Sequence, residues 1–393
     1  MNTCSDNYKD IICIATKRID DNLPTNVQQL MLRLAEKHRV LYIEPPVDSV
    51  FIARNPAFML REQYLKSICP KFLKPIWAII FPYERWVPFF LRSLNRKKII
   101  ASIKHAIRTF QIKPEIVWIF RPQDYWIAEH LNPTYLCYHI TDKYNTMPIN
   151  AKSKNDALKL DRLEAKVVKN ADLIFCTAKS LWKEASTENR KSFFVGNVAD
   201  VKHFGKANDP ETKIPEDIAD LRHPVAGFFG AIDSFKLDFD LINITAKTLS
   251  KGSVALIGPI KESANTKNHK KPPQGENIYY LGTKDYFSLV GYLKKFDVCI
   301  IPYKNSEYTQ HVFPLKFFEY LAAGKPIVST SLPALNDFKD YFYRADSEAE
   351  WAKAIINALN ENDTKKQLER KTLARNNCWE SRIRNIESIL RTL

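Results

Sequence analysis

The chain has 393 residues, of which 45% are hydrophobic and 12% aromatic. This composition excludes an intrinsically disordered chain, and the length indicates two domains. The formal net charge of +15 predicts a surface that attracts polyanions such as nucleic acid, anionic lipid or phosphorylated small molecules. The first twenty residues lack a basic segment followed by a long apolar run, so we expect no signal peptide there.

The first half of the chain alternates short apolar runs with amphipathic patterns, beginning with the run "IICIAT". This alternation predicts a parallel sheet covered by helices. We expect strands at 11–16, 39–45, 115–120, 134–141, 171–177 and 192–196, and helices at 26–38, 98–110, 124–131, 155–169 and 179–188.

A basic and aromatic insert interrupts this series at residues 51–98. From Val47 to Lys113 there are thirteen Lys or Arg residues against three Asp or Glu residues. One interpretation is a surface that binds nucleic acid, and another is docking on an anionic membrane. The third is an ordinary hydrophobic core with a basic surface. The most apolar window, "FLKPIWAIIFPYERWVPFFL", contains charges and three prolines, so we expect that it does not span a bilayer as one helix.

The polar segment at 205–224 contains three prolines and is typical of a linker. A second α/β series follows it, with strands expected at 225–232, 253–260, 276–282 and 297–303, and helices at 239–249, 287–296, 347–359 and 378–390. The sequence therefore predicts two doubly wound domains. Ligands in such folds bind at the carboxyl ends of the strands, and two such domains facing each other form a cleft.

Several common site types are poorly supported. The chain has ten glycines and neither G-x-G-x-x-G after the first strand nor G-x-x-x-x-G-K-[ST], which argues against a dinucleotide-binding enzyme or a P-loop NTPase. The seven cysteines form no C-x-x-C pair and no Cys/His cluster with metal spacing, so we expect no metal site. Four of them, Cys13, Cys137, Cys176 and Cys299, lie inside expected strands, where a reduced thiol packs as a small apolar side chain. We expect a cytosolic compartment.

The stretch "HVFPLKFFEYLAAGKPIVST", from His311 to Thr330, predicts a short helix, a stop at Gly324 and a strand. Because the helix follows a strand of a parallel sheet, its first N–H groups and its dipole form a potential anion site. Lys316 and Glu319 are three residues apart and share one face. One interpretation is that Lys316 binds an anion and Glu319 binds sugar hydroxyls. The other is that the two residues form a solvated ion pair without function.

This stretch resembles the donor-binding helix of GT-B glycosyltransferases of the family 4-like group, which typically reads E-G-F-G-L-x-x-L-E-A-x-A-x-G-x-P-V-V. "VAGFFGAIDSF", "ALIGP", "VGNVADVKHF" and "NNCWESRIRNIESIL" extend the resemblance over most of the chain. "RVLYIEPP" and "CYHITDKY" resemble the members that make teichuronic acid and other surface polysaccharides. The resemblance implies GT-B architecture, with two doubly wound Rossmann-like domains facing across a cleft.

The resemblance also implies a donor site for a nucleoside-diphosphate sugar. Glu319 matches the glutamate that binds the ribose, and the helix start implies diphosphate contacts by Lys316 and by the backbone at Phe313, Pro314 and Leu315. Lys236 matches the diphosphate lysine, and Tyr303 and His311 are expected near the donor sugar. The chain departs from the family pattern at two positions, since His311 replaces the first glutamate and Ala231 or Ile232 replaces an arginine.

An acceptor hydroxyl needs a base if sugar transfer inverts configuration. The expected strand at 134–141 ends in "CYHITDKY", which offers Asp142 and His139 as candidates. Asp142 could equally cap a turn, and His139 could be a packed core residue. Asp20, Asp21 and Asn22 follow the first strand and are expected to touch the acceptor.

We therefore expect an acceptor-binding domain at 1–205, a donor-binding domain at 206–375 and a helix at 376–393 that crosses back to the first domain. The expected activity is metal-independent transfer of a sugar to a lipid-linked glycan, without a cofactor, at the cytoplasmic face of the membrane. Three alternatives stay open: a nucleotide-sugar epimerase of the same fold, a non-catalytic nucleotide-sugar or glycan-binding partner, and a nucleic-acid binder.

Overall fold

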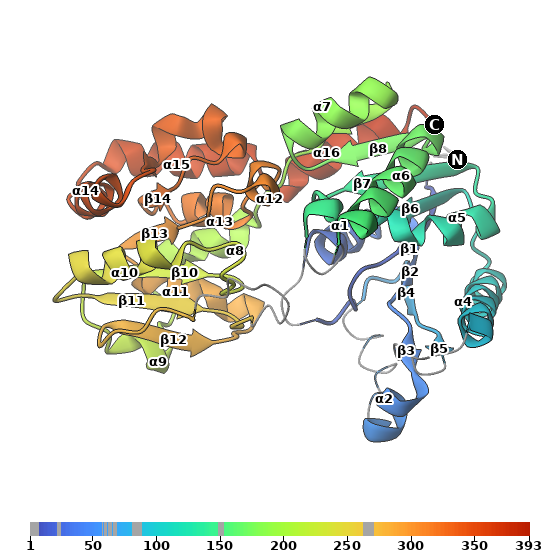
Figure 1. The fold of residues 1–393 in the computed structure, drawn as a ribbon, viewed down its shortest axis with the longest axis horizontal. Helices are drawn as coiled ribbons and strands as arrows, with labels where there is room; N and C mark the ends of the chain where they lie inside the picture. The colour runs from blue at the N-terminus through green and yellow to red at the C-terminus, as the bar shows by residue number, and fades with distance from the viewer. Residues whose placement is uncertain are drawn as a thin grey trace, which may run out of the picture. The chain divides into compact units, whose positions relative to one another are not determined.

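The computed structural model describes residues 8–21, 25–56, 58, 61, 65, 69–80, 89–147, 153–261 and 271–393. These residues form two compact units. The first is drawn from residues 1–144, 153–176 and 182–193, and the second from residues 145–152, 177–181 and 194–393. Each unit contains a sheet whose recorded strand pairs are parallel, accompanied by helices (Figure 1). This arrangement confirms the predicted α/β class.

The described part of the first unit carries a seven-stranded sheet in the order β4-β2-β1-β6-β7-β8-β9. Its strands are β1 (Asp10–Ile14), β2 (Arg39–Ile43), β4 (Leu73–Ile76), β6 (Ile116–Ile119), β7 (Tyr135–Ile140), β8 (Leu173–Cys176) and β9 (Ser192–Phe194). β1 pairs in parallel with β2 on one side and with β6 on the other. The order of strands reverses between β1 and β6, which is where open α/β sheets bind ligands.

The inner strands of the first sheet, from β2 to β8, are buried on both faces, as is usual in parallel sheets. In β1, Ile11, Ile12 and Cys13 have no exposed surface. The strand nevertheless begins with the buried Asp10, whose carboxylate accepts hydrogen bonds from Arg39 Nε (2.6 Å) and from the backbone N–H of Lys113 (2.7 Å). These partners offset the cost of burying its charge.

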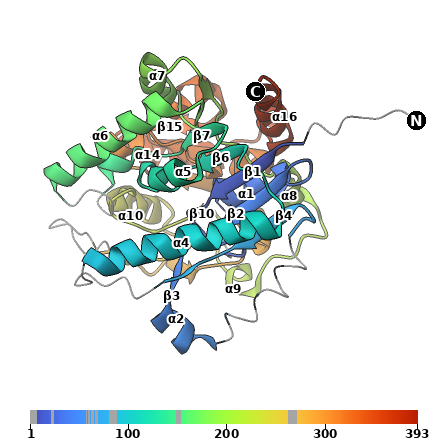
Figure 2. The ribbon, with the colours of Figure 1, turned by 90° about the vertical axis from the view of Figure 1, so that its right-hand side faces the viewer.

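The described helices of the first unit include the five predicted ones and one short helix, at 49–54, that was not predicted. They are α1 (Asn26–Leu34), α2 (Ser49–Arg54), α4 (Phe89–Thr109), α5 (Tyr125–Leu131), α6 (Lys154–Asn170) and α7 (Lys179–Glu188), whose first three residues are assigned to the second unit. α4 begins nine residues earlier than the predicted start at residue 98. Figure 2 shows its full length, and it lies beside β5 (Ile79–Ile80), which pairs with β3 (Val47–Asp48).

The predicted insert at 51–98 is described only in part, and Tyr64, Phe81, Tyr83 and Trp86 lie outside the described residues. Phe58 packs edge-on against Phe51 and Trp77, with ring centroids 5.5 Å apart in both pairs. Arg18 and Arg61 lie over the Phe58 ring, at 4.7 and 5.3 Å from its centroid. Phe51, Phe58 and Trp77 therefore contact arginines of their own unit.

Within its described residues, the second unit carries a six-stranded sheet in the order β12-β11-β10-β13-β14-β15. Its strands are β10 (Val225–Phe229), β11 (Ser253–Ile257), β12 (Ile278–Gly282), β13 (Val298–Ile301), β14 (Ile327–Ser329) and β15 (Tyr343–Arg344). β10 pairs in parallel with β11 and with β13, so the strand order of this sheet reverses between β10 and β13.

The described helices of the second unit include one long helix that was not predicted from the sequence, besides three of four or five residues. They are α8 (Val201–Gly205), α9 (Glu216–Ala219), α10 (Phe239–Thr248), α11 (Leu289–Lys295), α12 (Glu307–Gln310), α13 (Lys316–Ala322), α14 (Glu348–Leu359), α15 (Thr364–Asn376) and α16 (Trp379–Leu390). The missed helix, α15, is highly polar and has no apolar stripe. It is fixed by Asp363, which caps its first turn, and by the buried Arg370, which pairs with Glu361.

The polar segment at 205–224, expected as a linker, packs within the second unit. Lys294 Nζ donates hydrogen bonds of 2.8 Å to the backbone carbonyls of Asp209, Pro210 and Thr212, and Ile218 has no exposed surface. A polar segment can pack in this way because most of these contacts are made by its backbone rather than by an apolar face.

Candidate functional site

The clearest candidate site lies where β10 and β13 end in the second unit. Tyr303 follows β13 and is 2% exposed, and Lys316 Nζ donates a 2.8 Å hydrogen bond to its hydroxyl. Lys236, in the loop after β10, places its Nζ 5.2 Å from the centroid of the same ring, and Lys316 Nζ lies 5.1 Å from it. Two ammonium groups therefore approach one buried phenol at the reversal point of the sheet.

The electrostatics of Tyr303 reflect these two lysines. Burial raises the pKa of a tyrosine, yet the charges of Lys236 and Lys316 outweigh burial and hold the pKa of Tyr303 below its ordinary value. Two like charges close together are unfavourable unless an anion is present. The arrangement therefore suits a ligand that carries more than one negative charge.

A glycine lets Lys316 come this close to the sheet. Gly230 follows β10 with φ of +140°, a conformation that favours glycine. A Cβ at this position would lie 3.2 Å from Lys316 Nζ, which is tighter than ordinary packing. The Lys316 side chain thus passes Gly230 through space that the side chain of another residue at this position would occupy.

Helix α13 confirms the predicted helix, stop and strand, because Gly324 has φ of +70° and β14 begins at Ile327. The interpretation of Lys316 and Glu319 as a solvated ion pair is wrong, because Lys316 is only 9% exposed and points to Tyr303. Glu319 is half-buried. Burial raises the pKa of its carboxyl to about 7, even though the charge of Lys316 lowers it.

The loop before α13 contains the three predicted backbone positions. Phe313 stacks on Phe318 with centroids 5.2 Å apart, and Pro314 accepts a 3.0 Å hydrogen bond from the N–H of Phe317. Leu315 is the residue at the start of α13. The buried side chain of Asn197 donates a 3.0 Å hydrogen bond to the Phe313 carbonyl and so fixes this loop. Asn197 lies within "VGNVADVKHF", a stretch from which the sequence alone does not single it out as a site residue.

His311 lies at the C-terminal end of α12 rather than among the two lysines. Its Nδ1 lies 3.1 Å from Ser180 Oγ at the start of α7, and its ring is half-buried. The structure thus brings the side chains of Lys236 and Lys316 to Tyr303, and Glu319 lies one turn further along α13. The predicted contact of His311 with a donor sugar stays a prediction.

In the first unit, the predicted acid–base residues occupy different environments. Asp142 follows β7 and is half-buried, and its charge helps to raise the pKa of the buried Tyr144, after the larger effect of burial. His139 lies inside β7 with no exposed surface, and its ring stacks on Phe120 at 5.2 Å. The geometry therefore favours Asp142 over His139 as a group that could meet an acceptor.

The predicted acceptor residues lie after β1, and Asn22 is outside the described residues. Asp20 forms an ion pair with Arg61, which also pairs with the buried Glu44 at 2.6 Å. Asp21 is half-buried in the same loop. Asp20 is thus part of an ion-pair cluster beside the carboxyl ends of β1 and β2.

The sequence analysis missed a second ion pair beside this cluster. Arg121 and Asp124 follow β6, and Arg121 Nε and Nη2 donate hydrogen bonds of 2.9 Å to the two carboxylate oxygens of Asp124. Burial raises the pKa of Asp124 although Arg121 lowers it. The signal was "FRPQDYW", in which opposite charges stand three residues apart directly after a buried strand.

Neither a metal centre nor a membrane span is found within the described residues. No group of three or more His, Cys, Asp or Glu side chains among them could hold a metal ion. Likewise, no helix in the described part of the chain combines the length and apolar character needed to cross a bilayer. Cys13, Cys137, Cys176 and Cys299 are buried inside strands without disulfides, as predicted.

Comparison with known proteins finds a sequence family whose model matches the residues of this site. Residues 223–361, which contain Lys236, Tyr303, Lys316 and Glu319, match the family described as "Glycosyl transferases group 1". The chain is also 30% identical over 234 residues to the "Putative teichuronic acid biosynthesis glycosyltransferase TuaH" of Bacillus subtilis (strain 168). This match spans 57% of this chain and 57% of that relative.

Solved structures are similar over nearly the whole chain. HepE of Anabaena, in complex with UDP and glucose, has a TM-score of 0.67 and 13% identity, covering 98% of this chain and 100% of HepE. Sucrose-phosphate synthase of Thermosynechococcus elongatus has a TM-score of 0.66 and 14% identity, covering 98% of each chain. At these identities the likeness shows the fold, which is the predicted GT-B fold with two Rossmann-like domains.

Proposed function

We propose that this chain, whose residues 223–361 match the family described as glycosyl transferases group 1, is a glycosyltransferase that uses a nucleoside-diphosphate sugar. The observation that carries the proposal is the approach of Lys236 and Lys316 to Tyr303 at the reversal point of the second sheet. A diphosphate supplies the multiple negative charges that this arrangement lacks. As the glycosidic bond to the diphosphate breaks, the same ammonium groups stabilise the leaving charge.

The half-buried Glu319 is the group we assign to the ribose. When ionised, its carboxylate accepts two hydroxyl hydrogen bonds, which matches the two hydroxyls of a ribose. Tyr303 holds Lys316 in place by its 2.8 Å hydrogen bond and therefore acts as a positioning residue. Asn197 positions the loop at Phe313 in the same way.

For the acceptor we propose a lipid-linked glycan of surface-polysaccharide synthesis, because the chain is similar to a protein named for teichuronic acid biosynthesis. Asp142 is the proposed base if transfer inverts configuration, since it follows a strand end and is half-buried. We place the enzyme at the cytoplasmic membrane face. Helix α4 supports this because Arg92, Arg96 and Lys97 are exposed on it.

The experiment is a thermal-shift screen with a panel of nucleotide sugars, followed by turnover of the best donor with a glycolipid extract. The proposal predicts stabilisation by one nucleotide sugar and transfer of its sugar to a lipid-soluble product. Nucleotide-sugar binding without transfer to any acceptor would support the non-catalytic alternative. Tight, salt-sensitive binding of RNA or DNA with no UDP or GDP binding would contradict the proposal.

A further inference from the structure

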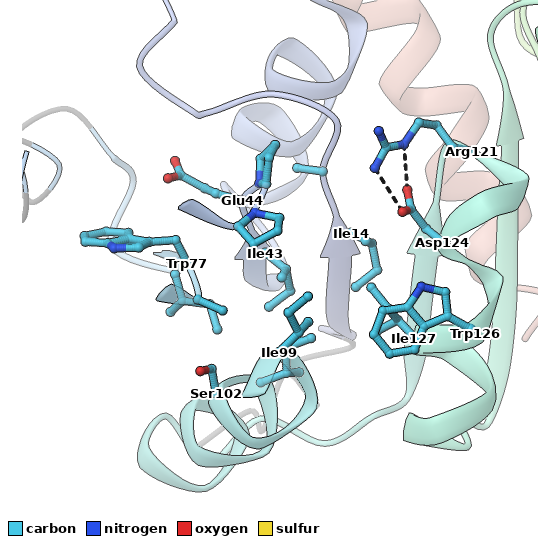
Figure 3. Close-up of a pocket in the computed structure, with 16 residues that line it drawn as sticks. Ile14, Ile43, Glu44, Trp77, Ile99, Ser102, Arg121, Asp124, Trp126 and Ile127 are labelled. Carbon is cyan, nitrogen blue, oxygen red and sulfur yellow. Dashed lines mark hydrogen bonds and ion pairs between the residues drawn. The ribbon is translucent and has the colours of Figure 1, made fainter. Parts of the chain in front are cut away.

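A pocket in the first unit opens where β1, β2 and β4 end, next to α4 (Figure 3). Isoleucines form much of its wall, and its volume is about 160 Å³. Ile14, Ile43 and Ile76 come from the strand ends, and Ile99 and Ile103 come from α4. Ala78 and Ile127 add further apolar surface, so much of the wall carries no hydrogen-bonding group.

A larger space of about 720 Å³ adjoins this pocket, and the two share Pro46, Ile99, Arg121 and Trp126 in their walls. Arg92 and Arg96 of α4 line the larger space together with Arg121. The Arg96 guanidinium lies 5.0 Å above the ring of Trp126, which orients it. One continuous hollow therefore combines an isoleucine wall at one end with the guanidinium groups of Arg92 and Arg96 at the other, and Arg121 lines both parts.

The carboxylates around this hollow already have partners, whereas two of its arginines pair with no carboxylate among the described residues. Asp124 binds Arg121, Glu44 binds Arg61, and Asp48 accepts a 2.8 Å hydrogen bond from the N–H of Phe51 at the start of α2. Arg92 and Arg96 form no ion pair with any residue that the structure describes. The arginine end therefore carries positive charge that a bound anion can complement.

We propose that this hollow binds the phosphate and adjoining alkyl chain of the lipid-linked acceptor, an inference that rests on the proposed glycosyltransferase function. Arginine presents a planar fork of donors that matches phosphate oxygens. The isoleucine wall suits an alkyl chain, because a sugar buried there would leave its hydroxyls without partners. The position at the β1/β6 reversal point places this ligand at the ligand-binding edge of the first sheet.

The test is calorimetry of the intact protein with decyl phosphate below its micelle concentration, compared with decanol and with inorganic phosphate. We expect decyl phosphate to bind at least tenfold more tightly than either comparison compound. The double variant R92Q/R96Q should weaken decyl phosphate binding at least tenfold. The matched variant K104Q/R108Q removes two exposed charges from the same helix, outside both walls, and should change binding less than twofold.

Equal affinity for inorganic phosphate would identify a phosphate site without lipid recognition and overturn the proposal. Equal affinity for decanol would remove the role of the arginines and also overturn it, as would unchanged binding by R92Q/R96Q. UDP titration of the same preparations separates this inference from the proposed function. If UDP binds and decyl phosphate does not, only the lipid pocket is refuted.

Discussion

Substitution of Lys316 by methionine tests the role of the ammonium group at Tyr303. The methionine keeps the apolar length of the side chain, so packing against Phe228, whose ring Lys316 Nζ approaches to 4.8 Å, is largely retained. The variant loses the 2.8 Å hydrogen bond to Tyr303 and one of the two positive charges at that ring. The pKa of Tyr303 should rise, because the charge of Lys316 helps to lower it.

The size of the effect follows from the kind of contact that is lost. A hydrogen bond between a charged donor and a phosphate contributes about 1.5–3 kcal/mol. At about 1.4 kcal/mol per factor of ten, the Kd for UDP should rise roughly 10-fold to 150-fold. The assay is titration calorimetry of wild-type protein and the Lys316→Met variant with UDP and GDP.

The matched control is Lys353→Met, which removes an exposed lysine from α14 of the same unit. It should leave the affinity for UDP unchanged, and both variants should keep the circular dichroism spectrum of the wild-type protein. Equal UDP affinity for the Lys316→Met variant and wild type would refute the assignment of Lys316 to the diphosphate.

Three further predictions test the other proposed residues. Because burial raises the pKa of Glu319 to about 7, its ribose-accepting carboxylate forms as the pH rises through 7. The ratio of the UDP affinity of wild type to that of the Glu319→Gln variant should therefore rise from about pH 6 to pH 8. Over the same range, the stability of wild type to unfolding should fall relative to that of the variant. A constant affinity ratio would contradict the ribose role. Asp142→Asn should lower inverting transfer by roughly 10²-fold or more with unchanged UDP affinity, and near-normal rates would exclude Asp142 as the base. Reversing Arg92, Arg96 and Lys97 to glutamate should reduce flotation with anionic liposomes, whereas reversing Lys247 and Lys353 should not; equal flotation of both would argue against docking through α4.

The donor-side helix could be predicted from sequence because its signals are local. Gly324 and Pro326 end the helix, and the strand before it fixes where the helix begins. The burial of Lys316 could not be predicted in this way. It depends on Gly230 and Tyr303, which lie on other strand ends and reach Lys316 only in the folded sheet.

In the first unit, the surroundings of several candidate residues could not be predicted from the sequence. His139 occupies an expected strand, but only the surrounding Trp118, Phe120 and Phe175 rings reveal that it is a core residue. In the sequence, Arg92 and Arg96 are only two of many basic residues, and they indicate no more than a general basic surface. Their place in one hollow with Arg121 depends on how α4 lies against the ends of three strands, which no local pattern encodes.

The most direct test of the central claim is a crystal structure of the protein with UDP. We expect diphosphate oxygens within hydrogen-bonding distance of both Lys236 Nζ and Lys316 Nζ, with the ribose hydroxyls at Glu319. UDP bound elsewhere, with these two lysines still directed at Tyr303 alone, would contradict this claim.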